Sequence, residues 1–134
     1  MPEKIIKTVF LAFLLFCPFQ ILAAGTAGAV ELPGFTSIIG EWSRTDGGYV
    51  LHVRSIRPDG SVDAGYFNPK EINIAEANVS EWKGMGKLFI KLQDEGYPGS
   101  TYTLYYYPEK DALAGFYYQA AMNQTFEVVF IRKK

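Results

Sequence analysis

Few side chains in this 134-residue sequence have the types and spacings that enzyme chemistry requires. The only cysteine, Cys17, falls in an apolar leader, and His52 is the only histidine. We therefore expect neither a thiolate nucleophile nor a structural zinc site. Residues 84–86 (Gly-Met-Gly) lack the third glycine and the following helix of a dinucleotide site. The carboxylates are dispersed over expected turns and outward faces, and only a pairing that arises in space would make them an acid–base site. The expectation is no enzymatic activity, no metal and no cofactor.

Recognition is the chemistry that the aromatic and amide residues favour. All nine tyrosines and both tryptophans follow residue 29. Tyrosine rings supply contact area together with a hydroxyl group, and side-chain amides orient a polar group of a ligand. Six residues of these types lie at or beside expected loops, where binding residues gather on a rigid scaffold. The expected ligand-binding residues are Tyr66, Asn68, Tyr97, Tyr102, Gln119 and Asn123.

Short strands of alternating polarity position these residues. In residues 49–56, for example, Leu51 and Val53 share one face, and His52 and Arg54 share the other. Turns that contain glycine separate the strands, because glycine accepts a positive φ. The expected strands are residues 38–44, 49–56, 61–67, 74–82, 87–92, 101–106, 112–119 and 124–132. Eight antiparallel strands with one apolar face predict an all-β, up-and-down barrel, since closure removes the sheet edges.

The connections of such a barrel alternate between its two ends. Those after the second, fourth and sixth strands are compact, whereas those after the third, fifth and seventh are richer in tyrosines and amides. The richer connections are residues 68–71, 93–100 and 120–123. We therefore expect a closed end and an open end, with binding at the open end. An eight-stranded barrel is just wide enough to be packed solid or to hold one small ligand, and both alternatives stay open.

Three residues are expected to seal the closed end. Gly40 leaves room for a close backbone approach, and Trp42 supplies a large apolar plug at the start of the first strand. With Arg132 at the end of the last strand, these residues resemble the calycin group, which joins lipocalins, fatty-acid-binding proteins and avidins. The resemblance implies that Arg132 packs over Trp42 in a cation–π contact of about 0.5–2 kcal/mol. The chain is shorter than lipocalins and lacks their helix before the last strand, and avidin's biotin-contacting residues cannot be mapped onto it.

A second resemblance covers nearly all of residues 38–134. The strings Thr45-Asp46-Gly47-Gly48-Tyr49, Tyr66-Phe67-Asn68-Pro69-Lys70 and Tyr97-Pro98-Gly99-Ser100-Thr101-Tyr102 are similar to those of a group of small, uncharacterised exported bacterial proteins. This resemblance implies a fold and export. It implies no activity.

The first 29 residues are interpreted as a signal peptide. Lys4 and Lys7 precede the apolar run 9–19, and Ala27-Gly28-Ala29 forms a small-residue cleavage signal. The expected mature chain, residues 30–134, is a single barrel domain in the periplasm or outside the cell. It carries 11 basic and 13 acidic side chains, once Lys4, Lys7 and Glu3 are removed from the totals of 13 and 14. Without clustered basic residues, nucleic acid is not an expected partner.

Two functions follow as hypotheses from these patterns. The first is an exported, non-enzymatic binding protein that holds a small, partly apolar ligand at its open end. The second is a protein-binding module, such as an inhibitor of an exported hydrolase, that uses the same loops. A cavity lined by Tyr66, Tyr102 and Tyr106 would favour the first. A filled barrel with exposed Tyr97 and Met122 would favour the second.

Overall fold

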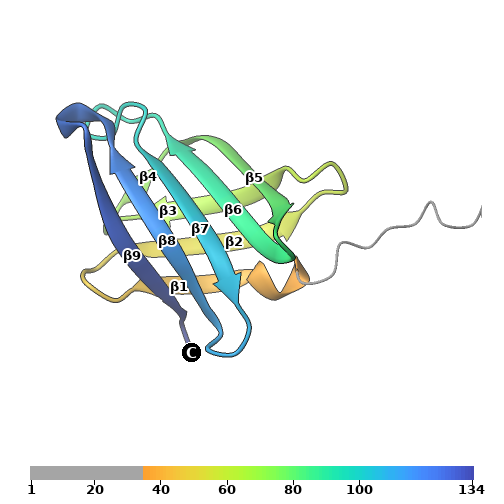
Figure 1. The fold of residues 1–134 in the computed structure, drawn as a ribbon. Helices are drawn as coiled ribbons and strands as arrows, with labels where there is room; N and C mark the ends of the chain where they lie inside the picture. Colours follow the sequence, from red (N-terminus) through yellow and green to blue (C-terminus); the bar gives the residue numbers. More distant parts are fainter. Residues whose placement is uncertain (1–34) are drawn as a thin grey trace, which may run out of the picture. The chain divides into compact units, whose positions relative to one another are not determined.

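The computed structural model describes residues 35–134, and the expected leader, with Cys17, lies outside them. Nine antiparallel strands form one sheet in the order β4-β3-β2-β1-β9-β8-β7-β6-β5, which curls into a nearly closed barrel (Figure 1). The elements are η1 (Thr36–Ile38), β1 (Gly40–Arg44), β2 (Val50–Ile56), β3 (Val62–Phe67), β4 (Glu71–Ile72), β5 (Ile74–Trp82), β6 (Met85–Leu92), β7 (Thr101–Tyr107), β8 (Ala112–Gln119), η2 (Ala120–Met122) and β9 (Gln124–Arg132). Neither of the two helical turns in this part of the chain is long or apolar enough to cross a membrane.

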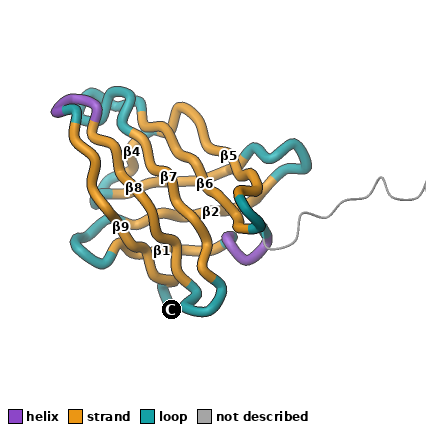
Figure 2. The backbone as a smooth tube through the Cα atoms, viewed as in Figure 1, coloured by secondary structure: helices purple, strands orange, loops and turns teal. Residues whose placement is uncertain are grey.

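The predicted all-β class is confirmed, but the predicted count of eight strands is wrong. The additional strand is β4, whose residues Glu71 and Ile72 pair with Phe67 and Tyr66 of β3. Two residues are too few to produce a readable alternation of polarity. The first strand also begins later than expected, at Gly40, because the 3-10 turn η1 occupies Thr36–Ile38 (Figure 2).

The barrel is closed by β1 and β9 and interrupted between β3 and β5. Trp42 of β1 pairs with Arg132 of β9, as expected for the first and last strands of a closed barrel. Between β3 and β5 the ladder shrinks to a bridge between Ser61 and Asn78, beside a 2.8 Å hydrogen bond from the Val79 N–H to the Gly60 carbonyl. The predicted up-and-down barrel, in which each strand pairs with the next, is therefore interrupted between β3 and β5. β4 occupies the open-end half of the β3 edge, which β5 would otherwise pair with.

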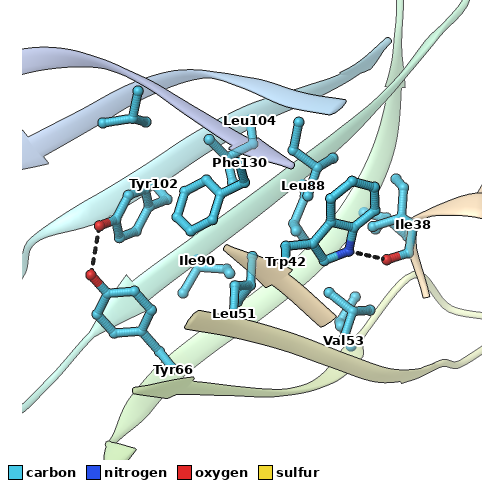
Figure 3. Close-up of a cluster of buried hydrophobic side chains, with 14 of the residues drawn as sticks. Ile38, Trp42, Leu51, Val53, Tyr66, Leu88, Ile90, Tyr102, Leu104 and Phe130 are labelled. Atoms are coloured by element: carbon cyan, nitrogen blue, oxygen red, sulfur yellow. Dashed lines mark hydrogen bonds between the residues drawn. The ribbon is translucent and has the colours of Figure 1, made fainter. Parts of the chain in front are cut away.

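The barrel interior is packed with large side chains over most of its length. Trp42, Tyr66, Tyr102 and Phe130 are each at most 1% exposed, and leucine, isoleucine and valine side chains fill the space between them (Figure 3). These residues occupy alternate positions of their strands, as the sequence predicts. Close packing of this kind makes the interior a rigid support for the two ends of the barrel.

Candidate functional site

The closed end is sealed by Arg132 over Trp42, and the contact expected between them is present. The Trp42 ring is fully buried, and the Arg132 guanidinium carbon lies 4.3 Å from the ring centroid. Arg132 Nε donates a hydrogen bond to Asp111 Oδ2 at 2.7 Å, and its Nη1 donates to the Ile39 carbonyl at 2.8 Å. The Trp42 indole N–H donates to the Ile38 carbonyl at 2.8 Å. The Arg132 guanidinium and the Trp42 indole N–H are therefore both hydrogen-bonded to neighbouring groups.

Gly40 is required by this arrangement for two reasons. Its φ of +141° is unfavourable for residues that carry a Cβ. A Cβ at this position would also run into the Arg132 guanidinium. Tyr106 belongs to the same end, since its ring meets Trp42 edge-on at 6.1 Å and its hydroxyl donates to Asp111 Oδ1 at 2.9 Å. Tyr106 is thus absent from the open end, because β7 runs from the open end at Thr101 to the closed end at Tyr107.

A pocket of about 380 Å³ lies at the open end, above the packed interior. Its walls combine aromatic rings with one cation and one amide. The lining residues are Arg44, Tyr49, Gly96, Tyr97, Tyr117, Gln119 and Phe126. The barrel is therefore packed solid over most of its length and has a cavity at its open end.

Arg44 is the central polar residue of the pocket. Gly40, Trp42 and Arg44 alternate along β1, so Arg44 shares the inward face with the tryptophan. Its Nε and Nη2 donate to the two Asp46 carboxylate oxygens at 2.5 and 2.9 Å, and its Nη1 donates to the Tyr102 hydroxyl at 2.9 Å. These bonds use three of the five guanidinium N–H donors. Within residues 35–134, two donors of Arg44 are thus left for a bound molecule.

Two tyrosine rings hold the Arg44 guanidinium in place. Its carbon lies 4.3 Å from the Tyr49 ring centroid and 5.7 Å from the Tyr117 ring centroid. Each contact is a cation–π interaction that weakens when the guanidinium moves. Together with Asp46 and Tyr102, the rings fix the orientation of a side chain that is flexible in solution. Arg44 is therefore preorganised as part of the pocket wall.

A layer of tyrosines supports the pocket from below. Tyr66 and Tyr102 are each 1% exposed, and their hydroxyls share a hydrogen bond of 2.6 Å (Figure 3). The Tyr102 ring also packs against Tyr117 at 4.6 Å and against Phe130 at 5.5 Å. Through this layer the pocket lining is connected to the barrel core.

The ionisation states of the site follow from burial and pairing. The hydrogen bond from Arg44 holds the pKa of the Asp46 carboxyl below its usual range, and the same bond raises the pKa of Arg44. Burial raises the pKa of Tyr102 to about 12, and burial also raises the pKa of Tyr66. Near neutral pH the pocket therefore contains an ionised Arg44–Asp46 pair above neutral tyrosines. This arrangement presents guanidinium N–H donors beside tyrosine hydroxyls that keep their protons.

The structure distributes the six expected binding residues over three environments. Tyr97 and Gln119 line the pocket, and Tyr66 and Tyr102 lie buried beneath it. Asn68 supports the lining, since its side-chain N–H donates to the Tyr97 hydroxyl at 3.0 Å.

Asn123 does not line the pocket. It ends η2 at the outer surface, with φ +50°, and accepts a hydrogen bond from the Tyr118 hydroxyl at 3.0 Å. Tyr118 faces outward on β8, because Tyr117 faces inward beside it. The expectation for Asn123 rested on its place in a loop and did not consider the direction of this turn.

Sequence reasoning missed five lining residues, Arg44, Tyr49, Gly96, Tyr117 and Phe126. Arg44, Tyr117 and Phe126 occupy inward positions near the open ends of their strands, Tyr49 directly precedes β2, and Gly96 lies in the loop between β6 and β7. A usable signal was the shared face of Trp42 and Arg44, because a charged residue on an inward face needs a partner or a ligand. The loop at residues 45–48 also belongs to the open end, where it supplies Asp46.

No family model, curated protein or solved structure matches the chain. Residues 35–134 contain no group of three histidine, cysteine, aspartate or glutamate side chains that could hold a metal ion. His52 lies on the outer face of β2, 3.9 Å from a Glu41 carboxylate oxygen.

Proposed function

We propose that this chain is an exported, non-enzymatic binding protein of calycin-like architecture. Its function is to hold a small, partly apolar molecule in the open-end pocket. The observation that carries the proposal is the pocket itself, in which four aromatic rings surround a preorganised arginine. Its volume of about 380 Å³ falls in the range of ordinary ligand sites, roughly 300–1,000 Å³.

The pocket walls suggest the chemistry of the ligand. The rings of Tyr49, Tyr97, Tyr117 and Phe126 offer flat apolar surfaces for a ring or a short hydrocarbon segment. Arg44 offers N–H donors, and the Gln119 amide offers both a donor and an acceptor. The ligand therefore has an apolar body and a hydrogen-bond acceptor that faces Arg44. Because the Arg44 side chain is already fixed, little ordering opposes binding.

Export is the second part of the proposal. It rests on the basic start, the apolar run and the Ala27-Gly28-Ala29 signal of the leader. The periplasm and the outside of the cell are both consistent with this pattern.

A protein-binding module remains the second candidate, and one observation favours it. Met122 in η2 is 61% exposed beside the open end, as expected for a contact with a partner. Tyr97, the other residue expected in such a contact, lines the pocket, and its hydroxyl accepts a hydrogen bond from the Asn68 side chain. The small-ligand function is therefore the one that the open-end geometry supports better.

A thermal-shift screen tests the proposed function. The purified protein is screened against a panel of small aromatic and amphipathic molecules that includes 8-anilinonaphthalene-1-sulfonate, and in parallel against periplasmic proteins by pull-down. Tyr97→Ala and Asn68→Ala should weaken binding of the small molecules while leaving the melting temperature of the free protein near wild type. Asp59→Ala, in a closed-end turn, is the matched control and should bind like wild type. A ligand whose binding is unchanged by every open-end substitution would refute this site.

A further inference from the structure

The outer face of β7–β9, together with the end of β5, carries large apolar side chains that the barrel leaves uncovered. We call this set the outer patch. It consists of Trp82 (44% exposed), Tyr105, Tyr107 (43%), Phe116 (46%), Val129 (39%) and Ile131 (50%). An antiparallel sheet with one face on the core is expected to present polar residues on its solvent face. An apolar patch in that position indicates an interaction surface.

Strand register makes the outer patch continuous. Tyr105, Ala114 and Val129 lie side by side across three strands, and Tyr107, Ala112 and Ile131 form the next row. Because the middle residue of each row is an alanine, the larger side chains border a groove of about 490 Å³. The Trp82 ring extends this surface, with its centroid 5.0 Å from that of Tyr105.

The opposite outer face has a different character. On β1–β3 the outward positions carry charged pairs, including Arg54 with Asp63 at 3.2 Å and His52 with Glu41 at 3.9 Å. Those side chains suit contact with water. The apolar character is thus a property of one side of the barrel, which argues that this side alone is covered by a partner.

Two charges flank the outer patch on opposite sides. Lys87 of β6 lies beside Tyr105, and Glu127 of β9 lies beside Phe116. Within residues 35–134 neither side chain takes part in an ion pair. Lys87 shares its row with Val129, and Glu127 lies two residues away along β9, so the line between the two charges runs diagonally across the patch. A two-fold axis in the plane of the patch and perpendicular to that line would place each Lys87 over a Glu127 of the second copy, and symmetry would produce this pair twice.

We propose that the outer patch is the interface of a homodimer of this chain. The apolar groove supplies the buried centre of the contact, and the two Lys87–Glu127 pairs set its register and orientation. The open-end pocket belongs to the ends of the strands, so the dimer leaves it accessible. The inference is independent of the proposed ligand function.

Sedimentation velocity of the purified protein tests this proposal. The wild-type protein is expected to be a dimer at micromolar concentration. Phe116→Glu should give a monomer, and Lys87→Glu or Glu127→Lys alone should each raise the dissociation constant at least about tenfold, because two attractive pairs become repulsive. Lys70→Glu makes the same charge change outside the patch and should leave the dimer intact. Circular dichroism melts check that each variant is folded.

Charge exchange identifies the proposed pairing. The double variant Lys87→Glu/Glu127→Lys should recover the dimer, and an equimolar mixture of the two single variants should form a heterodimer. Wild-type protein that is monomeric throughout the micromolar range would overturn the proposal. A dimer that persists in Phe116→Glu, or that is not restored by charge exchange, would equally overturn it.

Discussion

Removing the Tyr102 hydroxyl should destabilise the protein more than removing the Tyr66 hydroxyl. Tyr102→Phe deletes the oxygen that accepts the Arg44 Nη1–H and that shares a 2.6 Å hydrogen bond with Tyr66. Within residues 35–134, the Tyr66 hydroxyl, in a side chain that is 1% exposed, is then left without a partner. A buried polar group without a partner costs about 1–3 kcal/mol. In Tyr66→Phe the Tyr102 oxygen still accepts from Arg44, so the cost should be that of one ordinary hydrogen bond, about 0.5–1.5 kcal/mol.

The double variant makes the prediction sharper. In Tyr66→Phe/Tyr102→Phe no hydroxyl is left unpaired between the two rings. Its loss of stability should therefore be smaller than the sum of the two single losses by about 0.5 kcal/mol or more, the range of coupled neighbours. Urea denaturation measures the three free energies of unfolding, with unchanged m-values as the check that the folded state is intact. Equal single costs, a reversed order or strict additivity would refute the network described beneath the pocket.

Three further predictions concern the plug, the tyrosines and the leader. Trp42→Ala should cost about 3–5 kcal/mol in urea denaturation, as large core truncations do, and Arg132→Ala should cost less; a Trp42→Ala cost within about 0.5 kcal/mol would contradict the plug. Because the folded-state pKa of Tyr102 is raised from 10.0 to about 12, the unfolded tyrosine ionises first as pH rises. The free energy of unfolding should therefore fall by about 1.4 kcal/mol per pH unit between those values from Tyr102 alone, and further from Tyr66. In this pH range the phenolate absorbance that belongs to Tyr102, identified by comparison with Tyr102→Phe, should appear only on unfolding. Mass spectrometry of the protein from its native host should find a chain that begins at Val30, and a full-length product would contradict cleavage after Ala29.

The strands and the closed end could be predicted because their signals are local. Alternation placed Leu51 and Val53 on one face of their strand, and the structure buries both. The contact between Trp42 and Arg132 was expected from the resemblance to calycins, and it requires the first and last strands to be neighbours, as they are. Strand β4 escaped prediction because its two residues form a strand only through pairing with β3.

The pocket could be predicted only in part, because it depends on register between strands. Tyr97 and Gln119 were expected from their place near the open end, and both line the pocket. Arg44 sits at an inward position that the alternation with Trp42 already indicates, yet its partners Asp46 and Tyr102 appear only once β1 and β7 are placed in space. Asn123 shows the opposite case, in which a residue in the expected loop turns outward to Tyr118.

The most direct test of the proposed binding function is to map where a ligand binds. Backbone and side-chain N–H signals of ¹⁵N-labelled protein are followed by NMR while the tightest-binding molecule of the thermal-shift panel is added. We predict that shifts concentrate on Arg44 Nε, Gly96 and the Gln119 amide, while Gly84 and Gly86 at the closed end stay in place. Shifts confined to the closed end or to the outer patch, or a panel in which no molecule perturbs the pocket, would contradict the proposed function.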